Sequence, residues 1–123
     1  MSDLDLLPHR LAICRLPVDE ATPTWATGPF VSITRTAGEL SIVCAEELVP
    51  AGTKCEGGWR VFQVAGPLDF SLTGILAAIA DPLAHAGVSI FALSTFDTDY
   101  VMVKESSLAK ALDALRAAGH RLR

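Results

Sequence analysis

Two apolar segments near the end of the chain enclose a short polar one. Val88 to Leu93 and Tyr100 to Val103 are rich in β-branched and aromatic residues, whereas Ser94 to Asp99 is polar. A strand, a polar turn and a second strand predict a β-hairpin. Its turn holds two carboxylates, three hydroxyls and one phenyl ring, which indicates either ordinary turn chemistry or a ligand site.

A helical period of apolar residues appears on both sides of this hairpin. The first helix is expected to begin at Ser71 or Asp69, followed by one apolar face formed by Leu72, Ile75, Leu76, Ile79 and Leu83. Pro82 predicts a kink near residues 78–82, or a helix that ends and restarts there. A second helix is expected between an N-cap at Ser106 and Gly119 at the C′ position.

The N-terminal half shows strands without long helices. Leu11 to Leu16 reads as a strand after a polar lead, and residues 30–34 and 40–44 form a second hairpin around the turn 35–39. Residues 45–49 suit one helical turn. Gly57 and Gly58 are expected to separate this half from an alternating strand at residues 59–64.

The two halves are related by an internal repeat. A shift of 60 residues places residues 33–43 over 93–103 without a gap, with Glu39 over Asp99. Each unit then has the order βαββαβ, which predicts an α+β fold of two ferredoxin-like units. Their antiparallel sheets carry the helices on one face, and the first unit has reduced helices. We divide the chain into an N-terminal unit, 1–57, and a C-terminal unit, 58–123.

The strand at Val88 to Leu93 is apolar on both faces, which is typical of a strand buried on two sides. Pairing of the two halves, and then of two chains, would cover it. We therefore expect a homodimer.

Charge and hydropathy exclude several classes of partner. A net charge of −4 and a pI near 5.2 argue against nucleic-acid binding, which needs a basic surface. No apolar run approaches the roughly 18 residues needed to span a bilayer, and the acidic N-terminus is unlike a signal peptide. We expect a soluble, cytoplasmic protein with neither nucleic acid nor membrane as partner.

The cysteines and histidines do not form a recognisable motif. Cys14, Cys44 and Cys55 are odd in number and widely spaced, which fits neither a disulfide framework nor a zinc site. We expect reduced thiols, no metal and no cofactor. A cysteine could serve as a nucleophile with His85 as its base, but neither has recognisable companions. Asp97 and Asp99 could in principle form an acid–base pair. We expect no catalytic residues and no enzyme activity.

Two long stretches carry a resemblance to a known family. They read GPLDFSLTGILAAIADPLAHAGVSIFALSTFDTDYVMVKE and ITRTAGELSIVCAEELVP. These resemble the ACT domain family, in particular small tandem-ACT proteins similar to aspartokinase regulatory domains and to CASTOR-type amino-acid sensors. The resemblance extends from about Leu11 to Leu115, without an attached catalytic domain. It implies a free amino acid bound at an interface between ACT units.

The resemblance also implies which residues meet the ligand. They lie in the loop that enters the first helix and in the hairpin turn: Asp69, Phe70, Ser71, Leu72, Thr73, Gly74 and Ile75, with Ser94, Thr95, Phe96, Asp97 and Asp99.

The chemistry of these residues supports a ligand site and also a plainer alternative. Unpaired N–H groups at a helix start suit a carboxylate, and Asp97 or Asp99 suits an ammonium or guanidinium group. Phe70 and Phe96 would wall the site, and Gly74 would let a ligand approach the backbone. Ser71 as a simple N-cap and Asp97 as a simple turn residue explain the same pattern.

Two functions remain open at this point. The first is a non-catalytic regulator that binds an amino acid, and the second is a ligand-free module for dimerisation or for docking on an unidentified protein. The sequence names neither the amino acid nor the downstream partner.

Overall fold

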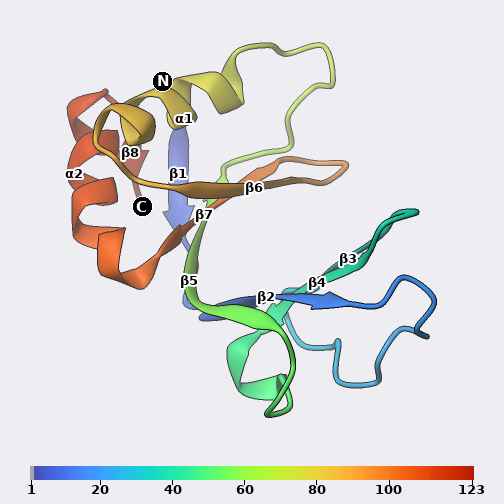
Figure 1. Cartoon of the computed structure of the whole chain (residues 1–123). Helices are drawn as coiled ribbons and strands as arrows, with labels where there is room; N and C mark the ends of the chain where they lie inside the picture. Colours follow the sequence, from blue (N-terminus) through green and yellow to red (C-terminus); the bar gives the residue numbers. More distant parts are fainter. Residues whose placement is uncertain (1) are drawn as a thin grey trace. The chain divides into compact units, whose positions relative to one another are not determined.

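The structure is a computed structural model that describes residues 2–123, which form two compact units (Figure 1). The N-terminal unit is His9–Trp59, and the C-terminal unit combines residues 2–8 with Arg60–Arg123. The fold is α+β, as the repeat predicted. Among residues 2–123, neither helix has the length and apolar character that crossing a membrane requires.

The N-terminal unit is an antiparallel sheet with the order β3-β4-β2-β5. Its elements are β2 (Leu11–Leu16), β3 (Ser32–Arg35), β4 (Leu40–Ala45), the 3₁₀ turn η1 (Glu46–Leu48) and the first half of β5 (Cys55–Val64). Alternate residues of β2 and β4 form one buried cluster with Trp25, Ala26 and Val49 packed against it. Within residues 9–59, η1 is the longest helical segment, which confirms the predicted reduction of the helices.

The C-terminal unit has the sheet order β8-β1-β5-β7-β6. Its elements are β1 (Asp3–Leu6), the second half of β5, α1 (Ile75–His85), β6 (Ile90–Ser94), β7 (Asp99–Lys104), η2 (Glu105–Ser107), α2 (Leu108–Ala117) and β8 (Arg121–Leu122). From β5 to β8 this is the predicted βαββαβ order. Strand β1 is inserted between the first and last strands of that pattern.

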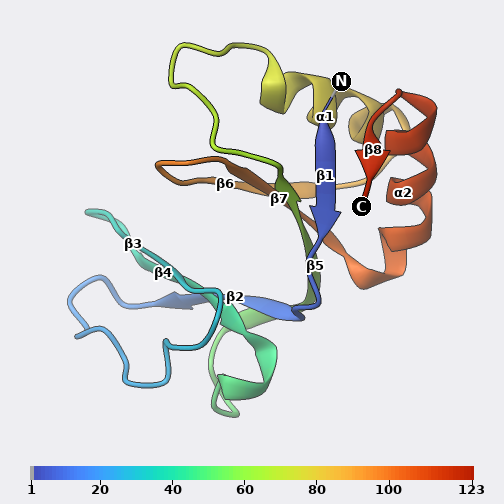
Figure 2. The same ribbon diagram turned by 180° about the vertical axis from the view of Figure 1, so that it is seen from behind.

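Strand β1 was not predicted. It pairs antiparallel with β5 and parallel with β8, so strands near both ends of the chain lie side by side (Figures 1 and 2). Leu4 is fully buried in the core of the C-terminal unit. The division at 57/58 placed these residues with the N-terminal unit, because the pattern Asp-Leu-Asp-Leu was read as a polar lead.

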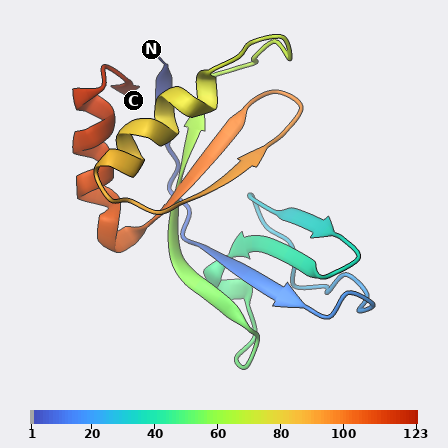
Figure 3. The ribbon, with the colours of Figure 1, turned by 45° about the horizontal axis from the view of Figure 1, so that its top comes forward.

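Helices α1 and α2 lie on the same side of the C-terminal sheet (Figure 3). The core between the helices and the sheet is almost entirely aliphatic, with one phenyl ring: Leu4, Phe62, Val64, Ile79, Leu83, Val88, Val101, Val103, Ala111 and Leu115. Apolar residues of α1 and α2 recur at helical spacing, and those of β5 and β7 alternate, so one face of each element enters this core.

Several expected boundaries were wrong. Strand β5 begins at Cys55 and therefore includes Gly57 and Gly58, which were expected to separate the halves. Helix α2 has Ser107 rather than Ser106 at its N-cap, without a side-chain cap hydrogen bond.

Strand β6 was expected to be buried on both faces. Among the strands of residues 2–123 it pairs only with β7, at the edge of the sheet, and its residues are half-buried or exposed. The expected cover of this strand included a second chain, so the exposed residues of β6 in one chain agree with that expectation, and the homodimer stays a prediction.

The internal repeat is real, but its offset is 59 residues instead of 60. The turn bond from Thr36 N–H to Glu39 O has its equivalent from Thr95 N–H to Thr98 O, and both measure 2.9 Å. The strand pair Arg35 and Leu40 corresponds to Ser94 and Asp99. Glu39 is therefore equivalent to Thr98, and the predicted match of Glu39 with Asp99 was wrong.

Helix α1 continues through Pro82 without interruption, so the predicted end and restart was wrong. Pro82 has no N–H to donate to the carbonyl of Ala78, four residues earlier. His120, which is 5% exposed, supplies the missing donor through Nε2 at 2.8 Å. Its Nδ1 accepts the N–H of Ser2 at 3.2 Å, so one imidazole satisfies backbone groups from the N-terminus and α1.

Both helices end with the hydrogen bonds of a Schellman motif. In α1, Gly87 N–H bonds Ala84 O and Val88 N–H bonds Leu83 O. Gly119, at φ 92°, closes α2 in the same way. Gly119 therefore acts as predicted, and Gly87 has the same role in α1.

We predict that His120→Ala lowers the free energy of unfolding by about 2 kcal/mol, because it leaves the Ala78 carbonyl and the Ser2 N–H without their partner. Urea denaturation measures this. His85→Ala is the control, because His85 is exposed and within residues 2–123 it bonds only Asp81 O. Its free energy of unfolding should change by no more than about 0.5 kcal/mol. Equal losses in the two variants would contradict the role of His120.

Candidate functional site

A cavity of about 340 Å³ lies in the C-terminal unit, between loop 65–74 and the β6–β7 turn. Ten of the twelve predicted ligand residues line it: Asp69, Phe70, Leu72, Gly74, Ile75, Ser94, Thr95, Phe96, Asp97 and Asp99. Ser71 and Thr73 do not. Leu68, Leu76 and Thr98 also line it and were not predicted. The cavity brings the two predicted segments together, and their ligand-binding role remains a prediction.

Two short hydrogen bonds hold the loop against the turn. Thr98 is 5% exposed, and its hydroxyl donates to Val64 O, at the end of β5, at 2.6 Å. The N–H of Leu68 donates to the carbonyl of Asp97, also at 2.6 Å. A Cβ added at Gly66 would lie only 3.1 Å from that carbonyl. The loop therefore approaches the turn closely, and this contact defines one wall of the cavity.

The turn is held by its own hydroxyl groups. Thr95 Oγ1 donates to Thr98 O at 3.2 Å, and Ser94 Oγ donates to Asp99 Oδ1 at 2.6 Å. The carboxylate of Asp97, by contrast, has neither a hydrogen bond nor an ion pair within residues 2–123. The side-chain hydrogen bonds of the turn are thus made by Ser94 and Thr95, and the Asp97 carboxylate is available for a ligand.

The Asp69 carboxylate accepts two hydrogen bonds within its own loop. Its Oδ1 accepts the N–H of Ser71 at 2.9 Å and the Ser71 hydroxyl at 2.8 Å. These two bonds hold the pKa of Asp69 below its usual value. The expectation that Ser71 caps α1 was wrong, because its hydroxyl is used by Asp69 and the helix begins later.

Gly74 is the true N-cap of α1, with φ 77° in the left-handed region. The space where a Cβ would point is open, so glycine is needed for backbone conformation. The first helical bond runs from Ala78 N–H to Gly74 O at 3.0 Å. The N–H groups of residues 75–77 therefore lack helical acceptors, and the partial positive end of the helix lies there instead of at residues 72–75.

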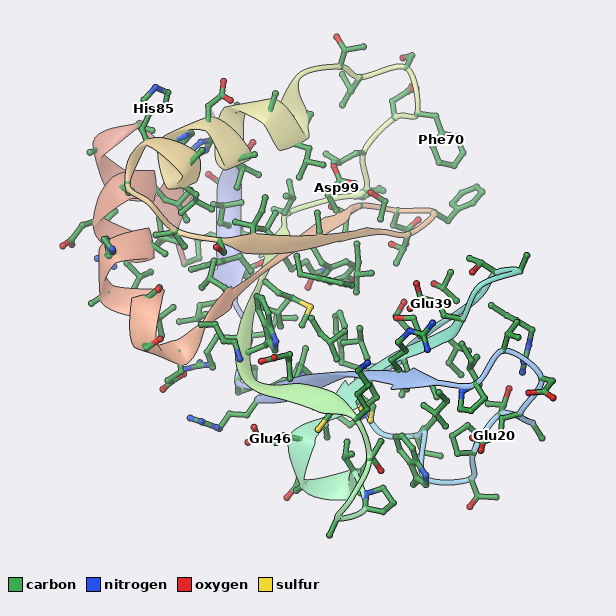
Figure 4. The ribbon with its side chains drawn as sticks, in the orientation of Figure 1. Glu20, Glu39, Glu46, Phe70, His85 and Asp99 are labelled. Carbon is green, nitrogen blue, oxygen red and sulfur yellow. The ribbon has the colours of Figure 1, made fainter. Side chains whose placement is uncertain are left out.

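Phe70 and Phe96 join the two segments at the surface. Their ring centroids are 4.9 Å apart in a T-shaped arrangement, and the residues are 75% and 79% exposed. In Figure 4 the labelled Phe70 and Asp99 come from these facing segments. Exposed aromatic pairs of this kind suit a contact with a ligand or a partner.

The cavity is electrostatically one-sided. Asp69, Asp97 and Asp99 contribute three carboxylates, and the described residues that line it include no lysine, arginine or histidine. The N-terminus of α1 supplies the compensating partial positive charge. This arrangement favours a ligand that carries a cationic group and a carboxylate. Within residues 2–123 no cluster of three metal-ligating side chains is found.

Thr98 is the main site residue that the sequence analysis missed. It was counted among the turn hydroxyls, and threonine is common in turns. Its burial follows from its place one residue before β7, where its side chain turns toward the end of β5. The correct repeat offset would have shown that Glu39 in the first hairpin is replaced here by a smaller hydroxyl residue.

Family comparisons cover most of the chain. A family model described as the ACT domain matches residues 54–117, and a second model, which describes an N-terminal domain, matches residues 9–52. A solved structure from Agobacterium tumefaciens is 43% identical, with a TM-score of 0.94 over 99% of this chain and 92% of that one. The regulatory subunit of aspartate kinase from Thermus thermophilus shares the fold at 11% identity, with a TM-score of 0.66 over 96% and 98% of the two chains.

Curated relatives include animal proteins. The cytosolic arginine sensor for mTORC1 subunit 1 from Mus musculus is 34% identical over 96 residues, which are 72% of this chain and 29% of that protein. The Homo sapiens protein of the same name is 39% identical over 59 residues, covering 47% and 18% of the two chains. The chain therefore spans less than a third of the curated relatives it matches.

We predict that Thr98→Val lowers the free energy of unfolding by about 1–3 kcal/mol, because the Val64 carbonyl loses its buried donor while the side-chain shape is kept. Chemical denaturation measures the loss. Thr73→Val is the matched control, since Thr73 is exposed and lies outside the cavity lining. A Thr98 variant as stable as the control would show that the hydroxyl does not hold the loop.

Proposed function

This chain belongs to the ACT domain family, and on that premise we propose that it is a non-catalytic regulatory protein that binds a free amino acid. The observation that carries this function is the cavity of the C-terminal unit. It combines carboxylates, hydroxyls and the unpaired N–H groups of a helix start within about 340 Å³. That volume lies in the usual range of small-molecule sites.

Each end of an amino acid has a partner in this cavity. The ligand carboxylate is bound at the N-terminus of α1, where the N–H groups of residues 75–77 lack helical acceptors. The ligand ammonium is bound by Asp97, whose carboxylate has no partner within residues 2–123, and by Asp99 beside it. The excess of carboxylates favours an amino acid with a second cationic group. The arginine sensors among the relatives agree with this preference.

The proposed assembly is a cytoplasmic homodimer in which a second ACT unit covers the mouth of the cavity. Phe70, Leu72 and Phe96 are exposed around that mouth. Burial of this apolar surface would exclude water from the ligand and strengthen its charged hydrogen bonds.

The same exposed residues support a second function. A module without a ligand would use Phe70, Leu72 and Phe96 only to dimerise or to dock on a protein partner. The two functions differ in one observable. Only the amino-acid regulator gains stability from a free amino acid.

We predict that one or more of the twenty amino acids raises the melting temperature in a thermal-shift screen, with a cationic one giving the largest rise. Binding to the folded state alone adds about 2.7 kcal/mol of stability at a ligand concentration a hundred times Kd. Millimolar additions without any rise would favour the ligand-free module. A rise only with neutral or acidic amino acids would overturn the charge preference and leave the regulator intact.

We predict that Asp97→Asn weakens binding of the amino acid found in that screen by about 10- to 100-fold, because a charge-assisted hydrogen bond contributes about 1.5–3 kcal/mol. Isothermal titration calorimetry measures the change in Kd. The control is Asp113→Asn, at an exposed position of α2. It removes the same charge away from the cavity and should leave Kd within a factor of two to three. Equal effects in both variants would indicate a long-range charge effect in place of direct contact.

A further inference from the structure

Cys14 and Cys55 lie directly opposite each other on β2 and β5 of the N-terminal unit. Although 40 residues separate them in the sequence, they are partners in the antiparallel register. The next residues along, Arg15 and Lys54, form a hydrogen-bonded pair, because Arg15 N–H donates to Lys54 O at 3.0 Å. Along an antiparallel ladder, hydrogen-bonded pairs alternate with non-hydrogen-bonded pairs. Cys14 and Cys55, one step along from Arg15 and Lys54, therefore form a non-hydrogen-bonded pair.

This type of pair suits a disulfide. Directly opposed residues project from the same face of the sheet, and in non-hydrogen-bonded pairs the Cα atoms are about 4.5 Å apart. Disulfides form at Cα separations of about 4.4–6.8 Å. Cys14, Cys44 and Cys55 are free cysteines in this structure.

The third cysteine is less well placed. Cys44 on β4 is opposite Ala12, whereas Cys14 is opposite Ile42. Cys14 and Cys44 are therefore diagonal neighbours, at a typical Cα separation of about 7–8 Å, too far for a disulfide without movement of the backbone. Cys44 and Cys55 lie on β4 and β5, with β2 between them, which is also too far for a disulfide. The register thus selects Cys14 and Cys55 out of the three possible pairs.

The two paired thiols differ in accessibility. Cys55 is exposed, whereas Cys14 is buried at 1% exposure. Burial, and then the neighbouring Cys55 and Cys44, raise the pKa of the Cys14 thiol to about 12. Cys14 is therefore protonated near neutral pH and shielded from solvent, so an external reagent meets Cys55 first.

We propose that Cys14 and Cys55 form a reversible disulfide by exchange with a low-molecular-weight disulfide such as oxidised glutathione. The Cys55 thiolate attacks one sulfur of the reagent, forms a mixed disulfide and releases one glutathione thiolate. Cys14 then attacks Cys55 Sγ, its proton passes to the departing glutathione thiolate, and the second glutathione leaves as a thiol. The protein loses two electrons and two protons, and one disulfide is reduced to two thiols.

The bond would fasten β2 to β5 and close a long segment of the N-terminal unit. A cross-link of this kind restricts the unfolded chain and stabilises the folded one. The disulfide would lie in the N-terminal unit, whereas the amino-acid cavity lies in the C-terminal unit. Redox state and ligand would therefore act on different units of the same chain. This inference does not depend on the proposed amino-acid binding.

To test this, the full chain is equilibrated in glutathione buffers of decreasing reducing power. The remaining thiols are then alkylated, and the protein is analysed by intact mass and by peptide mapping. The wild type should lose the mass of two hydrogen atoms, retain one alkylatable thiol and show a peptide linking Cys14 to Cys55. Its melting temperature should rise, and dithiothreitol should reverse both changes. Cys44→Ala should form the same bond, whereas Cys55→Ser should show neither the mass loss nor the rise in melting temperature.

Three results would overturn the proposal. The first is a stable glutathione adduct on Cys55 without loss of that glutathione, which would show that Cys14 does not reach it. The second is a disulfide-linked dimer through Cys55. The third is a linking peptide that contains Cys44 in place of Cys14. Because Cys55 is exposed, Cys55→Ser should fold, and its thermal transition in reducing buffer checks that it does.

Discussion

The buried hydroxyl of Thr98 is the interaction on which the candidate site depends. It bonds the last residue of β5, and the next residues of the chain form loop 65–74. The loop therefore leaves the sheet beside the β6–β7 turn, where Leu68 binds the carbonyl of Asp97. Together with the Phe70–Phe96 ring contact, these bonds bring the helix start and the carboxylates of the turn to one cavity.

The internal repeat explains why the site is present in only one unit. In the N-terminal hairpin, Glu39 occupies the place of Thr98, and loop residues replace the helix that follows β5 in the other unit. The equivalent turn therefore has neither a buried hydroxyl nor a helix N-terminus to face. The N-terminal unit instead carries the opposed thiols Cys14 and Cys55. The two units share this hairpin and differ in their helices and in their side-chain chemistry.

The sequence was sufficient for the fold class, the family and the two segments of the site, because alternation and helical period report which residues are buried. It failed where a short segment or a long-range contact decides the structure. Strand β1 has only four residues, and its burial depends on β5 and β8, which are distant in sequence. The start of α1 was misplaced because Ser71 is a good N-cap by type, whereas Asp69 binds its hydroxyl. The opposition of Cys14 and Cys55 depends on strand register, which spacing alone does not reveal.

The central claim is that an amino acid binds between the start of α1 and the β6–β7 turn, and backbone amide NMR during a ligand titration tests it most directly. The account predicts saturable shifts for the amides of Ile75, Leu76 and Ala77 together with Thr95 to Asp97. Amides of β2 to β4 should stay unchanged. Saturable shifts confined to other residues, or no saturable shift with any of the twenty amino acids, would contradict the claim.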